Sequence, residues 1–167
     1  MDNLTTSITI YGLVQEGKWD QLYLEAKDFA ELLGYSLNYI GYTSSTHNST
    51  KVRKIPKNDK NLLLKLNDDT ISDMDLLSLP EGFKTACFDY DLMIARNQKF
   101  ITIILNSSDF EKVDLKQTIA TFSKYSKVSE IQVYEMDRDE TPFSFAFGGN
   151  PISCFPSLKM LPFDNKI

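Results

Sequence analysis

Aspartates at alternate positions are the residues of this chain whose spacing most directly suggests chemistry. Asp73 and Asp75 stand in the sequence SDMD, and Asp89 and Asp91 stand in FDYD. Residues two apart on a strand point to the same face, so each pair would present two carboxylates together. Such oxygen ligands can hold Mg²⁺ or Ca²⁺, and a carboxylate pair can supply the acid and the base of a hydrolase.

Solvation or partner binding would account for the same alternation. If residues 84–94 form a strand, then Phe88, Tyr90 and Leu92 face the core, and the aspartates simply lie on the solvent-facing side. The carboxylates could instead form a surface that binds a basic partner. A calcium-binding loop also needs a central glycine and a closing glutamate, and residues 68–75 do not provide them. We therefore predict no metal site, no cofactor and no catalytic residue.

His47 is the only histidine, and it lies in the polar sequence SSTHNST. A nucleophile–histidine–acid triad would have to use it. The sequence contains no GxSxG-type elbow and no cysteine in an activating context. We expect His47 to be a solvated loop residue, and we expect that the protein is not an enzyme.

Negative charge is concentrated in two segments. Between Asp68 and Asp91, seven carboxylates accompany the single Lys84, a local charge of −6, whereas the whole chain carries −5. A second acidic group surrounds Arg138. The predicted partner-binding residues are ten acids of these two segments: Asp68, Asp69, Asp73, Asp75, Asp89, Asp91, Glu135, Asp137, Asp139 and Glu140. If the two segments meet in space, they would form a surface that attracts a basic protein.

Length and composition predict one globular domain over residues 1–167, because a chain of this length can bury a substantial core. Cys87 and Cys154 are isolated, so we expect two buried, reduced thiols rather than a disulfide framework or a zinc site. No apolar run approaches the ~20 residues that span a bilayer, and the first residues lack a signal-peptide pattern. We expect a cytoplasmic protein that does not contact membranes.

The hydrophobic patterns predict an α+β fold. Apolar residues at three- and four-residue steps predict helices over 19–33 and 114–126, and Asp114 with Gln117 has the spacing of a capping box. Residues 62–66 fit either a short strand or a helical turn. Strands are predicted over 4–14, 35–43, 71–79, 84–94, 98–105, 129–136 and 142–147. This order suggests two helices packed on a mixed or antiparallel sheet, as in a ferredoxin-like core with extra strands.

Two segments fall outside this pattern. Residues 44–61 form a long polar loop that carries a basic cluster of Lys51, Arg53, Lys54, Lys57 and Lys60. The cluster could contact phosphate, neutralise the acidic band or simply keep the loop solvated; it contains no aromatic residue, and general nucleic-acid binding is not expected. Residues 150–167 form an apolar, irregular tail that we expect to cover a sheet edge or a groove.

The segment SDMDLLSLPEGFKTACFDYD (72–91) and the following strand QKFITIIL suggest a resemblance to a known class of proteins. In size, acidity and α+β layout it resembles the cytoplasmic immunity proteins of bacterial polymorphic-toxin and contact-dependent inhibition systems. The resemblance implies neutralisation of one cognate toxin by direct binding, and it transfers no catalytic residue. The alternatives are a carboxylate-dependent divalent-metal enzyme and a small-molecule sensory or adaptor domain.

Overall fold

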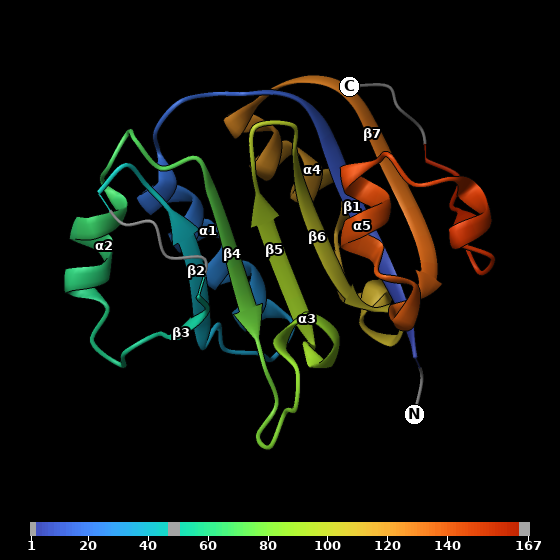
Figure 1. Ribbon diagram of the computed structural model, residues 1–167, viewed down its shortest axis with the longest axis horizontal. Helices are drawn as coiled ribbons and strands as arrows, with labels where there is room; N and C mark the ends of the chain where they lie inside the picture. The colour runs from blue at the N-terminus through green and yellow to red at the C-terminus, as the bar shows by residue number, and fades with distance from the viewer. Residues whose placement is uncertain (1–2, 47–50, 164–167) are drawn as a thin grey trace.

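One antiparallel sheet forms the centre of the protein (Figure 1). The computed structural model describes residues 3–46 and 51–163, and within them eight strands form the order β3-β2-β4-β5-β6-β1-β7-β8. The strands are β1 (Leu4–Val14), β2 (Tyr39–Thr43), β3 (Arg53–Lys54), β4 (Asp73–Ser78), β5 (Leu92–Arg96), β6 (Phe100–Asn106), β7 (Ser126–Asp137) and β8 (Lys159–Met160).

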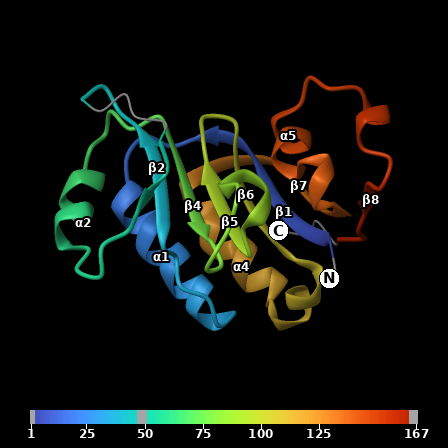
Figure 2. The same cartoon turned by 60° about the horizontal axis from the view of Figure 1, so that its bottom comes forward.

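Helices cover both faces of this sheet. They are α1 (Trp19–Leu32), α2 (Lys60–Leu66), α3 (Ala86–Asp89), α4 (Leu115–Phe122) and α5 (Pro142–Phe147). The apolar sides of α1, α2 and α4 belong to the main core on one face, and α3 and α5 pack on the opposite face (Figure 2). The predicted α+β fold, with helices packed on an antiparallel sheet, is confirmed.

The main core follows from the alternation of the strands. One residue from each of five neighbouring strands aligns across the sheet, and all five are almost completely buried: Leu76, Ile94, Ile103, Ile8 and Val133. Against this row, Phe29 of α1 meets Phe122 of α4 edge to face at a ring distance of 6.0 Å. Trp19 and Tyr23 are also buried in this layer, as their helical spacing predicts.

The strand order contains the expected split βαβ arrangement and places the extra strands inside it. β1 lies between β6 and β7, and α1 and α4, which follow β1 and precede β7, pack on the same face. β4 and β5 lie between β6 and β2 as a hairpin of extra strands. Residues 35–38 precede β2 rather than extending it. There the Asn38 side chain bonds to both backbone groups of Leu79, at 2.8 Å each.

The strand prediction for residues 84–94 is wrong over its first half. Residues 86–89 form the short helix α3, and only Leu92–Arg96 forms strand β5. Phe88 is consequently 37% exposed rather than facing the core, whereas Tyr90 is buried as expected. Asp89 and Asp91 therefore do not share one face of a strand.

Residues 142–147 form helix α5 and not the predicted strand. Pro142 occupies the first turn, where its missing N–H costs no hydrogen bond, and Thr141 before it has a left-handed backbone conformation. Residues 62–66 also turn out to be helical, as part of α2. Both cysteines, Cys87 and Cys154, are exposed, contrary to the prediction of buried thiols.

The two irregular segments are more ordered than the sequence indicates. The polar loop predicted over residues 44–61, which we call the basic loop, contains the edge strand β3, and α2 begins at its Lys60. His47 lies outside the described residues. The tail covers the sheet edge as predicted, because β8 pairs with Tyr134 and Glu135 of β7. Phe155 of the tail is buried, but Ile152 remains 74% exposed.

Candidate functional site

Five of the predicted partner-binding acids of the first acidic segment lie at two opposite ends of the sheet. Asp68, Asp69 and Asp73 lie where the chain leaves α2 and enters β4. Asp89 and Asp91 lie where the chain enters β5, beside the far end of β4, since the Asp91 N–H donates to the Ser78 carbonyl at 2.9 Å. Five residue steps along β4 separate the two ends, about 17 Å at the rise of a strand.

The second acidic segment joins Asp89 and Asp91. β7 ends at Asp137, which pairs with Leu4 at the start of β1, and this edge also holds the end of β6 at Asn106. We call the group Asp89, Asp91, Asp137, Asp139 and Glu140 the acidic end. Half of the acids predicted to bind a partner thus lie along one end of the sheet, and they come from both acidic segments.

Arg138 links the two chain segments that form the acidic end. Its guanidinium donates to the Tyr90 carbonyl and to the side-chain oxygen of Asn106, and it lies 4.8 Å from the centre of the Tyr90 ring. Asn106 in turn donates to Asp91 at 3.2 Å. A single cation between the acids therefore connects the residues before β5 with those after β7, far apart in the sequence.

Backbone hydrogen bonds fix the carboxylate of Asp89. It accepts from the N–H groups of Thr85 at 2.8 Å and Lys84 at 2.6 Å, at the start of α3. These bonds, helped by the charges of Lys84 and Arg138, lower the pKa of Asp89. Asp89 is thus ionised at neutral pH and held in one orientation.

The acids after β7 are also fixed by hydrogen bonds. Asp137 accepts from the Asp139 N–H at 2.9 Å, and the Asn3 side chain donates to both Asp137 and Asp139. Glu140 accepts from the N–H and the hydroxyl of Ser157 in the tail. Asp139 is the most exposed member of the group. The acidic end is therefore a prearranged surface rather than a set of free side chains.

A second hydrogen-bonded group beside the acidic end is not foreseen from the sequence. Asp109, which is buried, accepts from the Tyr35 hydroxyl at 2.6 Å and from Lys112 at 2.8 Å. Burial and the bond to Asp109 raise the pKa of Tyr35 to about 12. Asp109 and Lys112 stand three residues apart, but no sequence pattern connects them with Tyr35, 74 positions away.

The remaining predicted acids lie outside the acidic end. Asp68 accepts from the N–H and hydroxyl of Thr70 at 2.9 and 2.6 Å, which closes the turn after α2. Asp73 accepts from Thr43 at 3.3 Å across the strand pair. Asp69 is exposed, and Glu135 is half-buried where β7 meets β8.

Asp75 lies mid-strand, half-buried, on the same side of β4 as Asp73, as the alternation predicts. Burial and the Asp73 charge raise its pKa to about 6. The pair Asp73 and Asp75 does not meet Asp89 and Asp91. Within residues 3–46 and 51–163, no three His, Cys, Asp or Glu side chains gather where they could hold a metal ion.

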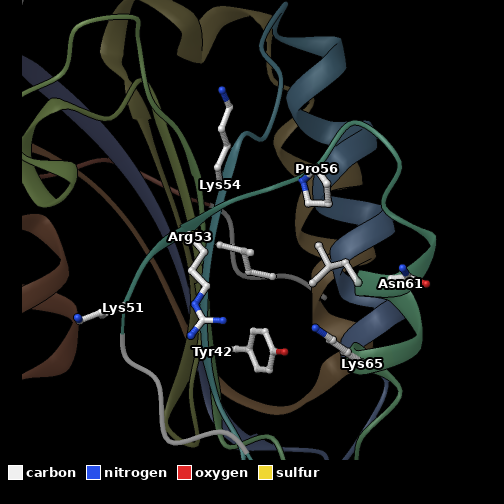
Figure 3. Close-up of a pocket in the computed structure, with 9 residues that line it drawn as sticks. Tyr42, Lys51, Arg53, Lys54, Pro56, Asn61 and Lys65 are labelled. Atoms are coloured by element: carbon white, nitrogen blue, oxygen red, sulfur yellow. The ribbon is translucent and has the colours of Figure 1, made fainter.

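The basic loop forms a second feature, a cavity of about 190 Å³ between the β2–β3 edge and α2. Its lining combines apolar residues, one aromatic ring and four cations, with no carboxylate among the lining residues that the structure describes: Ile40, Tyr42, Lys51, Arg53, Lys54, Pro56, Asn61, Leu62 and Lys65. Figure 3 shows Arg53 and Lys65 on either side of the Tyr42 ring. We call this feature the cationic cavity.

Comparison with protein-family models, with curated proteins and with solved structures found no match for this chain. Among the residues described, no helix is both long and apolar enough to cross a membrane.

Proposed function

We propose that this protein is a non-enzymatic binding protein of the immunity type, which neutralises a basic bacterial toxin domain by direct contact through its acidic end. One observation carries the proposal: Arg138 links the two acidic segments at one end of the sheet, and hydrogen bonds hold the carboxylates there in place. Prearranged charge lowers the ordering cost of association, and complementary charge accelerates encounter and selects the partner.

The acidic end also offers an apolar contact, which high-affinity interfaces need in addition to charge. Phe88 on α3 is 37% exposed and directly precedes Asp89. A protein interface concentrates its binding energy in a few aromatic or arginine side chains surrounded by polar contacts. In this proposal Phe88 is the anchor, and the carboxylates orient the basic partner around it.

The proposal places the protein in the cytoplasm. Exposed, unpaired thiols such as Cys87 and Cys154 persist where glutathione and thioredoxin keep cysteines reduced. An immunity protein acts there, inside the cell that makes the toxin or receives it.

The test is binding to the product of the gene adjacent to that of this protein, measured by calorimetry at two salt concentrations, together with protection of cells that express that product. Asp139→Lys should weaken the complex roughly tenfold or more, because like charges facing each other across an interface cost several kcal/mol. Phe88→Ala should weaken it by a similar factor. Higher salt should weaken the wild-type complex.

Asp69→Lys is the matched control, because Asp69 is an exposed acid of the first acidic segment at the opposite end of the sheet. It should leave the affinity unchanged within about twofold. Equal weakening by Asp69→Lys and Asp139→Lys would mean that net charge, not the acidic end, governs binding. Absence of both complex and protection would overturn the proposed function.

A further inference from the structure

The cationic cavity is a hollow that continues from the main core to the surface. Its floor consists of Ile40 and Leu62, which are both buried members of that core. Its volume of about 190 Å³ exceeds the space of a single water several-fold. It is smaller than the roughly 300–1,000 Å³ of pockets for drug-sized ligands, so a small molecule of about one ring fits it best.

Both walls of the cavity are held in place by the surrounding fold. On the strand side, the Ile55 N–H donates to the Asn38 carbonyl at 2.7 Å, which fixes the chain next to β3. On the helix side, Asp59 at the start of α2 accepts from Tyr23 at 2.9 Å and from Lys27 at 3.0 Å, both on α1. A cavity with such walls exists before any ligand arrives, which lowers the cost of binding.

The cations of the lining do not all serve the cavity. In Figure 3 the side chains of Arg53 and Lys65 approach Tyr42 from two sides, whereas those of Lys51 and Lys54 lead away from it. Arg53 comes from β3 and Lys65 from the last turn of α2. Two cations from different elements thus lie on either side of one aromatic ring, in a protein whose net charge is −5.

We propose that the cationic cavity binds a small organic anion, with its phosphate or carboxylate group between Arg53 and Lys65 and its apolar body against Tyr42, Ile40 and Leu62. The guanidinium of arginine matches the paired oxygens of both groups, and lysine adds a charge that either group can accept. The apolar floor contributes the burial that an inorganic ion lacks. The proposal is independent of the function assigned to the acidic end.

The test is calorimetry at low salt with four probes: phenyl phosphate, benzoate, benzyl alcohol and inorganic phosphate. Phenyl phosphate or benzoate should bind with a submillimolar dissociation constant, and the tighter of the two identifies the anionic group. Benzyl alcohol and inorganic phosphate should each bind at least roughly tenfold more weakly, because one lacks the charge and the other lacks the apolar body.

Arg53→Gln and Lys65→Gln should each weaken the binding of the better probe roughly tenfold. Lys54→Gln is the matched control, since it removes one charge of the same loop from a side chain that leads away from the cavity; it should change the affinity by at most about twofold. All three residues are exposed, so the variants should keep the thermal midpoint of the wild type. Equal weakening by all three variants, equal binding of benzyl alcohol, or no binding of either organic anion would overturn the proposal.

Discussion

Asp75 is a carboxylate in an unfavourable position, and replacing it should stabilise the protein. On β4 its cross-strand neighbours are Gly41 and Ala95, both buried and without polar side-chain atoms. The carboxylate is therefore partly removed from water, and Asp73 adds a like charge on the same side of the strand. Burial first, and then this charge, raise the pKa of Asp75 from 3.8 to about 6.

The magnitude follows from linkage between protonation and folding. The folded state holds the proton of Asp75 more tightly than the unfolded state does. The contribution of Asp75 to the free energy of unfolding therefore falls as the pH rises from 3.8 to about 6, and it stays low above that range. A rise in the pKa from 3.8 to about 6 corresponds to about 3 kcal/mol. Since the side chain is only half-buried, water screens part of this cost, and about 3 kcal/mol is the upper limit.

Asp75→Asn removes the charge and keeps the size of the side chain. Urea unfolding should show the variant to be more stable than the wild type by up to about 3 kcal/mol at pH 7.5, and by less than about 1 kcal/mol at pH 4, which lies just above the unfolded-state pKa of 3.8. Asp28→Asn, at an exposed acid on α1, is the control and should change little at either pH. A gain of the same size at both pH values would show that shape, not charge, causes the effect, and no gain at pH 7.5 would refute the reasoning.

Two further variants test how the fold is held together. Arg96, the last residue of β5, is 1% exposed and donates to the Gly17 carbonyl at 2.9 Å and to the Gln15 carbonyl. Arg96→Ala leaves both carbonyls without this donor, so it should lower the free energy of unfolding, measured by urea titration, by about 3 kcal/mol. A loss below about 1 kcal/mol would contradict this role of Arg96. Gly12→Ala would place a Cβ 2.0 Å from the Lys127 carbonyl oxygen at the bulge between β1 and β7, and should cost about 1–3 kcal/mol, seen as a lower thermal midpoint; an unchanged midpoint would show that the bulge can relax.

Long elements with a clear hydrophobic period could be predicted from the sequence, because their apolar residues fit either the helical period of about 3.6 residues or the strand period of about 2, but not both. β1 has the predicted bounds, and α1 ends one residue before the predicted end. The cap of α4 was also predictable, since Asp114 accepts from the Gln117 N–H at 3.1 Å. Each of these signals depends only on neighbours in the sequence.

Short apolar segments could not be assigned, because tertiary contacts decide their structure. In α5 the phenylalanines separate into two contacts: Phe143 and Phe147 lie against Phe100, and Phe145 lies 4.7 Å from Tyr134. A helix places Phe143 and Phe147 on one side, whereas the alternation of a strand would place all three phenylalanines on one face. The phenylalanine pattern of residues 142–147 fits both, and the partners on the sheet select the helix.

The position of the acidic-end carboxylates at one end of the sheet could not be predicted from the sequence either. Asp91 and Asp137 lie at the same end of the sheet, three strand spacings or about 14 Å apart, because β5, β6, β1 and β7 are neighbours with their ends in register. The same register keeps Asp73 at the other end. Charge counted along the sequence therefore overstated the acidic surface by merging two ends of one sheet.

Separation in space lets one protein carry two surfaces of opposite charge without their cancelling each other. Asp91, before β5, lies two strand spacings from β2 across the sheet, whereas Arg138, after β7, lies five strand spacings from β2 and the cationic cavity, about 24 Å. This is about three Debye lengths at physiological ionic strength, so the cations beside Tyr42 contribute little to the potential around Arg138. A basic partner and a small anion would each respond to the local charge at its own surface, and the net charge of −5 describes neither surface.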